Sequence, residues 1–185
     1  DLDNLFYCLE KEEKFLLFSL LQFDNYPVEE EWLINSLDPL ELDSVFDFKK
    51  SLNKLDGSWF AFTKESFDGK SKVDFFNPSI IDFLNDKLKE NPKITEIITQ
   101  NSVYLHQLCK GINGYVLSKP NDSQYNFFSK LLANWNNFKD KNDFIGEKIL
   151  AIICLNEFSN FENEFEGLLR IYDGRNNLNI YSNGW

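Results

Sequence analysis

Methionine is absent from the 185 residues, histidine occurs once, and cysteine occurs three times at widely separated positions. A zinc site draws on several His or Cys ligands, so the single His106 argues against one. Cys8, Cys109 and Cys154 form no Cys-x-x-Cys pair, which favours free buried thiols in a reducing cytosol over a disulfide framework. We therefore expect a cytoplasmic protein that holds no metal.

The chain also has no apolar run that approaches the roughly 18 residues of a membrane-spanning helix, and it has no secretory signal. A phosphate-binding loop of the Gly-x-x-x-x-Gly-Lys-Ser/Thr type is missing as well. Gly69-Lys70-Ser71 ends like such a loop, but Lys64 stands where the first glycine is required. The Gly-x-Ser-x-Gly sequence of a nucleophilic serine does not occur. These absences predict that the chain does not cross a membrane and is not an enzyme by itself.

Positive charge is scarce, because 19 Lys+Arg stand against 30 Asp+Glu and the net charge is −11. Residues 1–92 hold 20 acidic and 10 basic side chains, a net −10, whereas residues 93–185 hold 10 and 9, a net −1. Such an acidic surface repels phosphate groups, so we expect no nucleic-acid partner and no anionic membrane partner. The change in charge indicates two modules, which we place at residues 1–91 and 92–185.

Hydrophobic residues make up 43% of the chain and include nineteen phenylalanines, which is enough for a packed core. In the first module, apolar residues at helical spacing predict three helices. The first covers Leu9–Phe23, the second has Pro27 in its first turn and ends before Asp38, and the third covers Phe46–Leu55.

The apolar period then changes to that of two strands, at residues 58–63 and 72–76, with Asp68-Gly69 as the turn of a hairpin. Asn77 and Pro78 follow as the cap and the first residue of another helix. Three helices, a hairpin and a helix in this order predict a winged helix-turn-helix domain at residues 1–91.

From Pro92 onward the pattern is helical only. We expect helices over Ile94–Cys109, Gln124–Phe138, Phe144–Leu155 and Phe161–Tyr172, separated by short polar breaks. Consecutive helices of this length predict an α-helical bundle or the start of an α-solenoid at residues 92–185. The fold class is thus mainly α with one β-hairpin.

Three clusters could carry chemistry, and each also has a structural interpretation, which we favour. Glu29–Glu31 could bind a metal or transfer protons, but three acidic residues are typical of a solvated helix start. Lys49, Lys50 and Lys54 lie on the helix that reads DNA in a helix-turn-helix, yet acidic neighbours indicate a solvated face. Four aromatic residues of the hairpin, Trp59, Phe60, Phe75 and Phe76, could stack on bases, but such residues more often pack on the helices beneath.

One stretch resembles a known family. The run from Val73 to Leu84, VDFFNPSIIDFL, is similar to the end of the winged-helix domain in STAND-type NTPases, and the run from Phe46 to Ser58, FDFKKSLNKLDGS, is similar to the preceding helix and strand. These signal-transduction ATPases include immune receptors and bacterial antiphage proteins, and the likeness is greatest to a bacterial group fused to restriction-endonuclease-like domains. Asn77 and Ile81 depart from the pattern, because many relatives have His and Arg there.

The resemblance implies a non-catalytic regulatory fragment that serves antiphage defence, whose winged helix packs on an ATPase core encoded before Asp1. That core would bind ATP or ADP with Mg²⁺, whereas this chain would hold no cofactor of its own. Asn77 would contact the bound nucleotide. The helices after residue 92 would link to a sensor region or begin it, and this helical region would bind a protein ligand. Activation would produce an oligomer.

Two other functions and one other role remain open at this point. A winged-helix DNA-binding transcriptional regulator is the main alternative, and it requires a continuous positive stripe on the third helix and the hairpin. A structural adaptor built from helical pairs would explain the second module alone. Asn77 itself could be only a helix cap, because an Asn before a Pro at a strand-to-helix junction accepts a backbone N–H bond.

Overall fold

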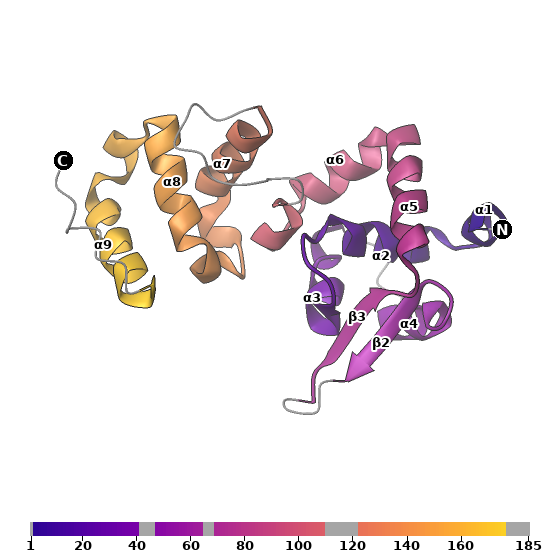
Figure 1. Ribbon diagram of the computed structural model, residues 1–185. Coiled ribbons are helices and arrows are strands. Elements are labelled where there is room, and N and C mark those ends of the chain that lie inside the picture. Colours follow the sequence, from indigo (N-terminus) through magenta and orange to yellow (C-terminus); the bar gives the residue numbers. More distant parts are fainter. Residues whose placement is uncertain (1, 41–46, 65–68, 110–121, 177–185) are drawn as a thin grey trace. The chain divides into compact units, whose positions relative to one another are not determined.

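The computed structural model describes residues 2–40, 47–64, 69–109 and 122–176. The chain forms two compact units, Asp1–Lys110 and Gly111–Trp185, each of which is described by itself. Helices dominate both units, and the first also holds a small antiparallel sheet (Figure 1). The prediction of a mainly helical chain with a β-hairpin is therefore confirmed. Within the described ranges, no helix combines the length and the apolar character needed to cross a bilayer.

The first unit contains six α-helices and three strands within its described residues. They are α1 (Leu2–Tyr7), α2 (Lys11–Gln22), β1 (Val28–Glu29), α3 (Glu30–Asn35), α4 (Phe48–Leu55), β2 (Phe60–Lys64), β3 (Ser71–Phe75), α5 (Pro78–Glu90) and α6 (Pro92–Gln100). The sheet has the order β1-β3-β2, and both pairs are antiparallel. A short 3₁₀ helix, η2 (Leu105–Gln107), follows α6.

Helix α2 is the centre of this unit. Leu16, Leu17, Leu20 and Leu21 are fully buried on successive turns and cover more than one side of the helix. A helix that is apolar on most of its surface has to be enclosed by other elements. The hairpin and the helices α4, α5 and α6 contribute buried side chains to the same core.

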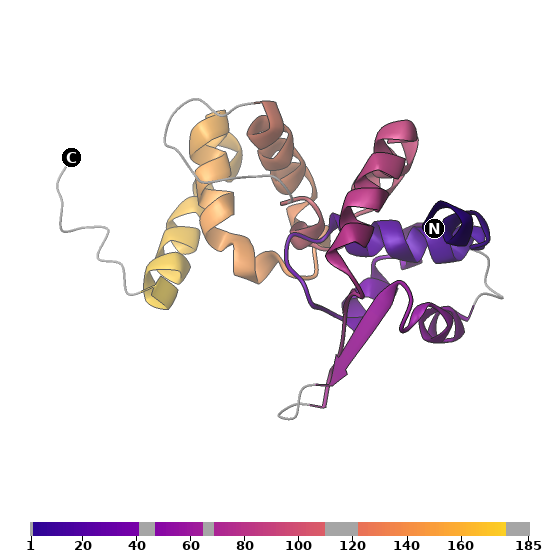
Figure 2. The same cartoon turned by 45° about the vertical axis from the view of Figure 1, so that its right-hand side comes forward.

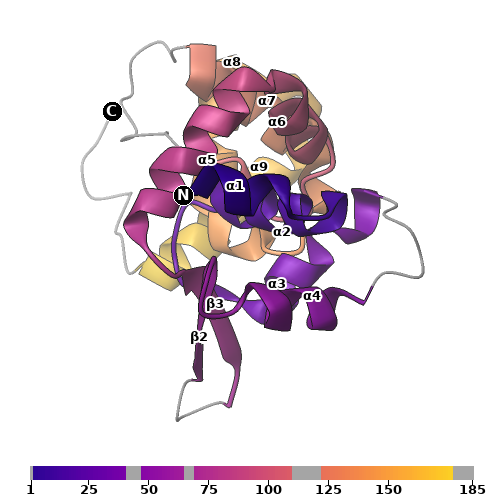
Figure 3. The same ribbon diagram turned by 90° about the vertical axis from the view of Figure 1, so that its right-hand side faces the viewer.

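The predicted hairpin is confirmed. β2 and β3 pair from Phe60 opposite Phe75 to Lys64 opposite Ser71, and they extend as a two-stranded ribbon beyond the helices of the unit (Figure 2, Figure 3). At the base of the ribbon, the rings of Phe60 and Phe75 lie 6.1 Å apart. Trp59 is also buried and contacts Phe6 of α1, with 6.2 Å between the ring centroids. The base of the hairpin is thereby joined to the helical core.

The start of α5 also confirms the prediction made from Asn77 and Pro78. Asn77 is the residue before the helix, and its Oδ1 accepts a hydrogen bond from the backbone N–H of Ser79 at 2.9 Å. Pro78 occupies the first helical position, where its missing N–H costs nothing. Ile80 and Leu84 on the next turns are buried in the core.

The structure corrects the predicted N-terminal elements. Pro27 does not begin a helix, because the following two residues form strand β1, in which Val28 lies opposite Val73 of β3. Helix α1 precedes the predicted start at Leu9, and its Phe6 is buried among aromatic rings. Cys8 was expected to be buried but is exposed, whereas Cys109 and Cys154 are partly buried; none of the three forms a disulfide.

The prediction of a single helix over Ile94–Cys109 is wrong, because α6 ends at Gln100. The side chain of Gln107 accepts the backbone N–H groups of Val103 and Tyr104, both at 3.1 Å. These bonds hold residues 103–107 in a tight turn that a continuous helix would not allow. The apolar residues after α6 belong to this turn, although their spacing resembles that of a helix.

This turn, the 103–107 segment, is fastened to α3 and to the end of α2. The ring of Tyr104 stacks on Trp32 at 4.7 Å with an interplanar angle of 10°, and its hydroxyl accepts a bond from Asn35. His106 is joined to Asp24 twice: its carbonyl accepts the Asp24 N–H at 3.1 Å, and its Nδ1 lies 2.9 Å from Oδ1. Residues up to this segment therefore belong to the first unit, beyond the boundary after residue 91 that the sequence predicts.

In the second unit, the described residues form α7 (Asp122–Asn134), α8 (Ile145–Leu155) and α9 (Phe158–Asn176), with the short 3₁₀ helices η3 (Trp135–Asn137) and η4 (Lys141–Phe144) between α7 and α8. Ile145, Ile149, Ile152 and Leu168 form the buried centre. Helix α9 is kinked at Phe161, which has non-helical backbone angles. The three helices follow the predicted positions closely, and residues 122–176 contain no strand.

Two residues of α8, Gly146 and Lys148, lie in close contact with aromatic rings of neighbouring elements. Lys148 is only 2% exposed, although its side chain is charged. Its Nζ lies 4.7 Å from the ring centroid of Trp135 and 5.1 Å from that of Phe161. The same Nζ donates to Glu164 Oε2 at 2.9 Å. Gly146 lies against Tyr172, since a Cβ there would be 2.6 Å from the Tyr172 ring. The second core thus contains a charged group surrounded by aromatic rings.

The hydroxyl of Tyr26 should make the stability of the first unit depend on pH in the alkaline range. Its hydroxyl donates to the carbonyl of Leu21 at 3.0 Å, and burial, reinforced by the negative charges of Asp74 and Asp24, raises the Tyr26 pKa well above 10.0. The folded state therefore keeps a proton that the unfolded state loses as the pH rises through about 10. Stability is fully present below that pH and should fall above it, by about 1.4 kcal/mol per pH unit for this one proton.

Urea unfolding between about pH 9 and 11.5 measures this fall. The variant Tyr26→Phe should lose about 1 kcal/mol at neutral pH, with its hydrogen bond, and show a shallower alkaline slope. Tyr7→Phe is the matched control, because Tyr7 is 67% exposed and its hydroxyl meets water before and after unfolding. An unchanged alkaline slope in Tyr26→Phe would contradict the assignment.

Candidate functional site

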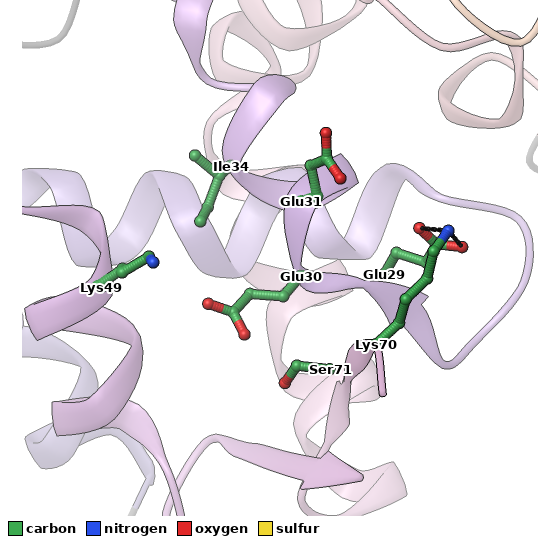
Figure 4. A pocket seen from close by; sticks show the side chains of 7 residues that line it. All are labelled: Glu29, Glu30, Glu31, Ile34, Lys49, Lys70 and Ser71. Carbon is green, nitrogen blue, oxygen red and sulfur yellow. Dashed lines mark hydrogen bonds and ion pairs between the residues drawn. The ribbon is translucent and has the colours of Figure 1, made fainter. Parts of the chain in front are cut away.

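A surface hollow of about 300 Å³ lies between α3, α4 and the start of β3 (Figure 4). Its walls are Glu29, Glu30, Glu31, Ile34, Lys49, Lys70 and Ser71. The acidic residues come from the end of β1 and the first turn of α3. Lys49 comes from α4, Lys70 directly precedes β3, and Ser71 is the first residue of β3. Three segments distant in sequence therefore supply charges of both signs to one opening.

Glu29 and Lys70 neutralise each other at one side of the hollow. The Nζ of Lys70 donates to both carboxylate oxygens of Glu29, at 2.9 and 2.8 Å. The pairing follows from the sheet, because β1 and β3 place Glu29 opposite Lys72, two residues after Lys70. An exposed pair of this kind contributes little to stability, but it removes Lys70 as a free phosphate ligand. The resemblance of Gly69-Lys70-Ser71 to a phosphate-binding loop therefore has no structural counterpart.

Glu30, Lys49 and Ser71 face the opening and lack such partners. Figure 4 shows Lys49 and Glu30 pointing toward the opening from opposite sides, with Ser71 beside Glu30 and the carboxylate of Glu31 turned away. Among the described residues, no ion pair or side-chain hydrogen bond engages Glu30, Lys49 or the Ser71 hydroxyl. The hollow thus presents one free negative and one free positive charge.

A second, smaller hollow of about 180 Å³ has Glu29 in common with the first. Its walls include Phe23, Val28 and Trp32, and the Asp24–His106 pair lies at its side. His106 therefore has a structural partner, as expected for a single histidine without further metal ligands. Within the described ranges, no three His, Cys, Asp or Glu side chains converge on a point where a metal could bind.

The lysines of α4 are not arranged as a continuous positive stripe. The Nζ of Lys54 lies 2.7 Å from Oε1 of Glu13, a carboxylate that is itself 1% exposed, and this hydrogen bond raises the Lys54 pKa. Glu13 also accepts the backbone N–H of Glu10 at 2.9 Å, which closes the first turn of α2. Lys49 shares its hollow with Glu30. Of the three predicted lysines, only Lys50 neither pairs with an acidic residue nor lines the hollow within the described structure.

The aromatic residues proposed above as a base-stacking platform are mostly core residues. Trp59, Phe60 and Phe75 are 3%, 0% and 6% exposed, so their faces are covered by protein. Phe76 alone is exposed, at 56%. The interpretation of these rings as packing groups is therefore confirmed for three of the four.

Phe76 begins a run of four exposed residues that continues through Ser79. Asn77 lies in this run at the β3–α5 junction, where its Oδ1 caps α5. In the described part of the chain, no acceptor engages its side-chain NH₂ group. The cap is thus confirmed, and a donor remains free at the surface for a ligand; the nucleotide contact itself stays a prediction.

No protein-family model, no curated protein and no solved structure matches this chain. A function is therefore inferred from the residues and their geometry, together with the resemblance of the run from Val73 to Leu84.

Proposed function

We propose that this chain is a non-catalytic regulatory part of a STAND-type NTPase. In this proposal α2, α3, α4, the β2–β3 hairpin and α5 form a winged helix that packs on an ATPase core. The second unit, α7 to α9, would belong to or lead to the sensor region. Antiphage defence is the setting that the resemblance implies, with ATP or ADP and Mg²⁺ bound by the core and oligomer formation on activation.

The observation that carries the proposal is the surface position of Asn77. The residues that resemble the family form one continuous strand, junction and helix, and the junction is exposed while its flanks are buried. Asn77 keeps a free NH₂ donor there, and an amide donor can bind a phosphate oxygen. A helix cap alone would need only its oxygen.

A DNA-binding regulator is the less favoured hypothesis for a domain with this order of helices and strands. Lys54 and Lys70 are paired with Glu13 and Glu29, and Lys49 stands across the hollow from Glu30. Few phosphates could be neutralised by such a surface, and non-specific DNA affinity depends on that number. A gel-shift titration should therefore show no tight, salt-sensitive binding; such binding lost in Lys49→Gln would favour the regulator instead.

Two substitutions of Asn77 in the full-length protein separate its roles as cap and as nucleotide ligand. Asn77→Ser keeps a capping oxygen but removes the amide donor, so ADP should leave faster while stability is unchanged. A lost hydrogen bond to a charged phosphate is worth about 1.5–3 kcal/mol, which predicts roughly tenfold or more faster release. Asn77→Ala should show the same release and lose about 1 kcal/mol of stability as well.

The measurements are the release rate of a fluorescent ADP and the thermal unfolding midpoint of each variant. If Asn77→Ser releases ADP at the rate of the unmodified protein, Asn77 is a helix cap and nothing more.

A further inference from the structure

We propose that the hollow between α3, α4 and β3 receives two oppositely charged side chains of a partner protein. An Arg or Lys of the partner would bind Glu30 and the hydroxyl of Ser71, and an Asp or Glu of the partner would bind Lys49. The ligand of this hollow would be a protein surface and not a nucleotide. The hollow would therefore serve a contact other than the one proposed at Asn77.

The charges that face the opening carry this inference. Glu29 is neutralised by Lys70, and the carboxylate of Glu31 is turned away, so a single acidic group faces a single lysine. Glu30 and Lys49 come from different helices and are not within ion-pairing distance of each other. Because the fold holds them apart, each keeps its capacity for a charged ligand.

A ligand with one charge would satisfy one of these groups and be repelled by the other. A ligand with both charges gains on both sides, which is the electrostatic complementarity that selects protein partners. Phosphate backbones are excluded by the same reasoning, because Glu30 repels them. Ile34 adds an apolar wall on which the methylene stem of an Arg or Lys can lie.

The openness of the hollow favours side chains of a protein over a free small molecule. Lys49 is exposed, and Glu30 and Ser71 are half-buried, so the opening is wide. Sites for small molecules enclose most of the ligand. Charged groups in contact with water are instead typical of the rim of a protein interface.

Nuclear magnetic resonance titration of the whole chain with blocked peptides tests the proposal. The probe is acetyl-Ala-Arg-Ala-Asp-Ala-amide, whose two charged side chains lie on the same side of an extended backbone. We expect saturable shifts of the backbone amides at Glu30, Lys49 and Ser71. Binding should be about tenfold tighter than for peptides in which either charged residue is Ala, and it should weaken at high salt.

Variants at the hollow provide the control. Glu30→Gln and Lys49→Gln should each reduce binding to the level of the singly charged peptides. The double exchange Glu30→Lys with Lys49→Glu should restore it for the peptide with Arg and Asp in reverse order. Lys50→Gln, one residue away on α4 and outside the hollow, should change nothing.

Three results would overturn the proposal. They are the absence of saturable shifts at these residues, equal binding of singly and doubly charged peptides, and tighter binding of free arginine than of the blocked peptide. The last would assign the hollow to a small zwitterion. None of these results depends on ADP release, so the proposal and the NTPase function fail independently.

Discussion

Replacing Phe60 with alanine is expected to lower the free energy of unfolding of the first unit by about 3–5 kcal/mol. Phe60 is completely buried at the base of the hairpin, where its ring lies 6.1 Å from that of Phe75. Truncation would open a cavity in a core that contains α2 and both strands. Since small domains are stable by only about 5–15 kcal/mol, this loss would leave a large fraction unfolded under mild denaturing conditions.

The matched control is Phe76→Ala, the same substitution at the residue that directly follows β3. Phe76 is 56% exposed, so its removal should cost less than about 1 kcal/mol. Urea unfolding followed by circular dichroism, with hydrogen exchange of the α2 amides to identify the unit, measures both variants. Equal losses in the two would contradict the position assigned to the core.

The second large effect is expected at Lys148 in the second unit. Lys148→Ala removes a buried side chain and should cost about 2–5 kcal/mol, as for other large-to-small changes. Lys148→Met keeps the volume and the contacts with Trp135 and Phe161 but removes the charge. It should be within about 1 kcal/mol of the unmodified chain, because Glu164 is 62% exposed and can be solvated by water.

Removal of the Glu164 carboxylate tests the Lys148–Glu164 ion pair through its acidic partner. Glu164→Ala leaves the Lys148 ammonium buried, with the two aromatic rings as its remaining partners among the described residues, and we expect a loss of about 2 kcal/mol. Glu166→Ala is the control, since its pair with Arg170 is 3.7 Å long and more than 80% exposed on both sides; a loss under about 0.5 kcal/mol is expected. If Lys148→Met were as costly as Lys148→Ala, packing would not be the main role of the side chain.

The hairpin and the start of α5 were predictable because their signals are local. Alternating aromatic residues, a glycine in the turn and the sequence Asn77-Pro78 each determine the conformation of their own neighbourhood. Strand β1 gave no such signal, because its two residues are extended only through pairing with Val73 and Lys72 of β3. The end of α6 was missed for a related reason, since the apolar spacing continues through Tyr104 while that ring is held by Trp32.

The candidate site was predictable only in part. The capping bond of Asn77 followed from its place before Pro78, and the acidic run Glu29–Glu31 was visible in the sequence. The sequence could not show that Lys70 would pair with Glu29 while Lys49 and Glu30 would face each other unpaired. Those relations depend on how α3, α4 and β3 pack, and no spacing along the chain encodes them.

The fastening of the 103–107 segment to α3 determines where this protein can be divided for separate expression. A chain shortened after Asn91 would lose Ile98 and Tyr104 from the first core and uncover the faces of Phe23 and Trp32 that Tyr104 contacts. Such a fragment would be prone to aggregate, because newly exposed apolar patches associate. A fragment that ends at Cys109 would keep these contacts, so the contacts of Tyr104, and not the change in net charge near residue 92, define a usable terminus.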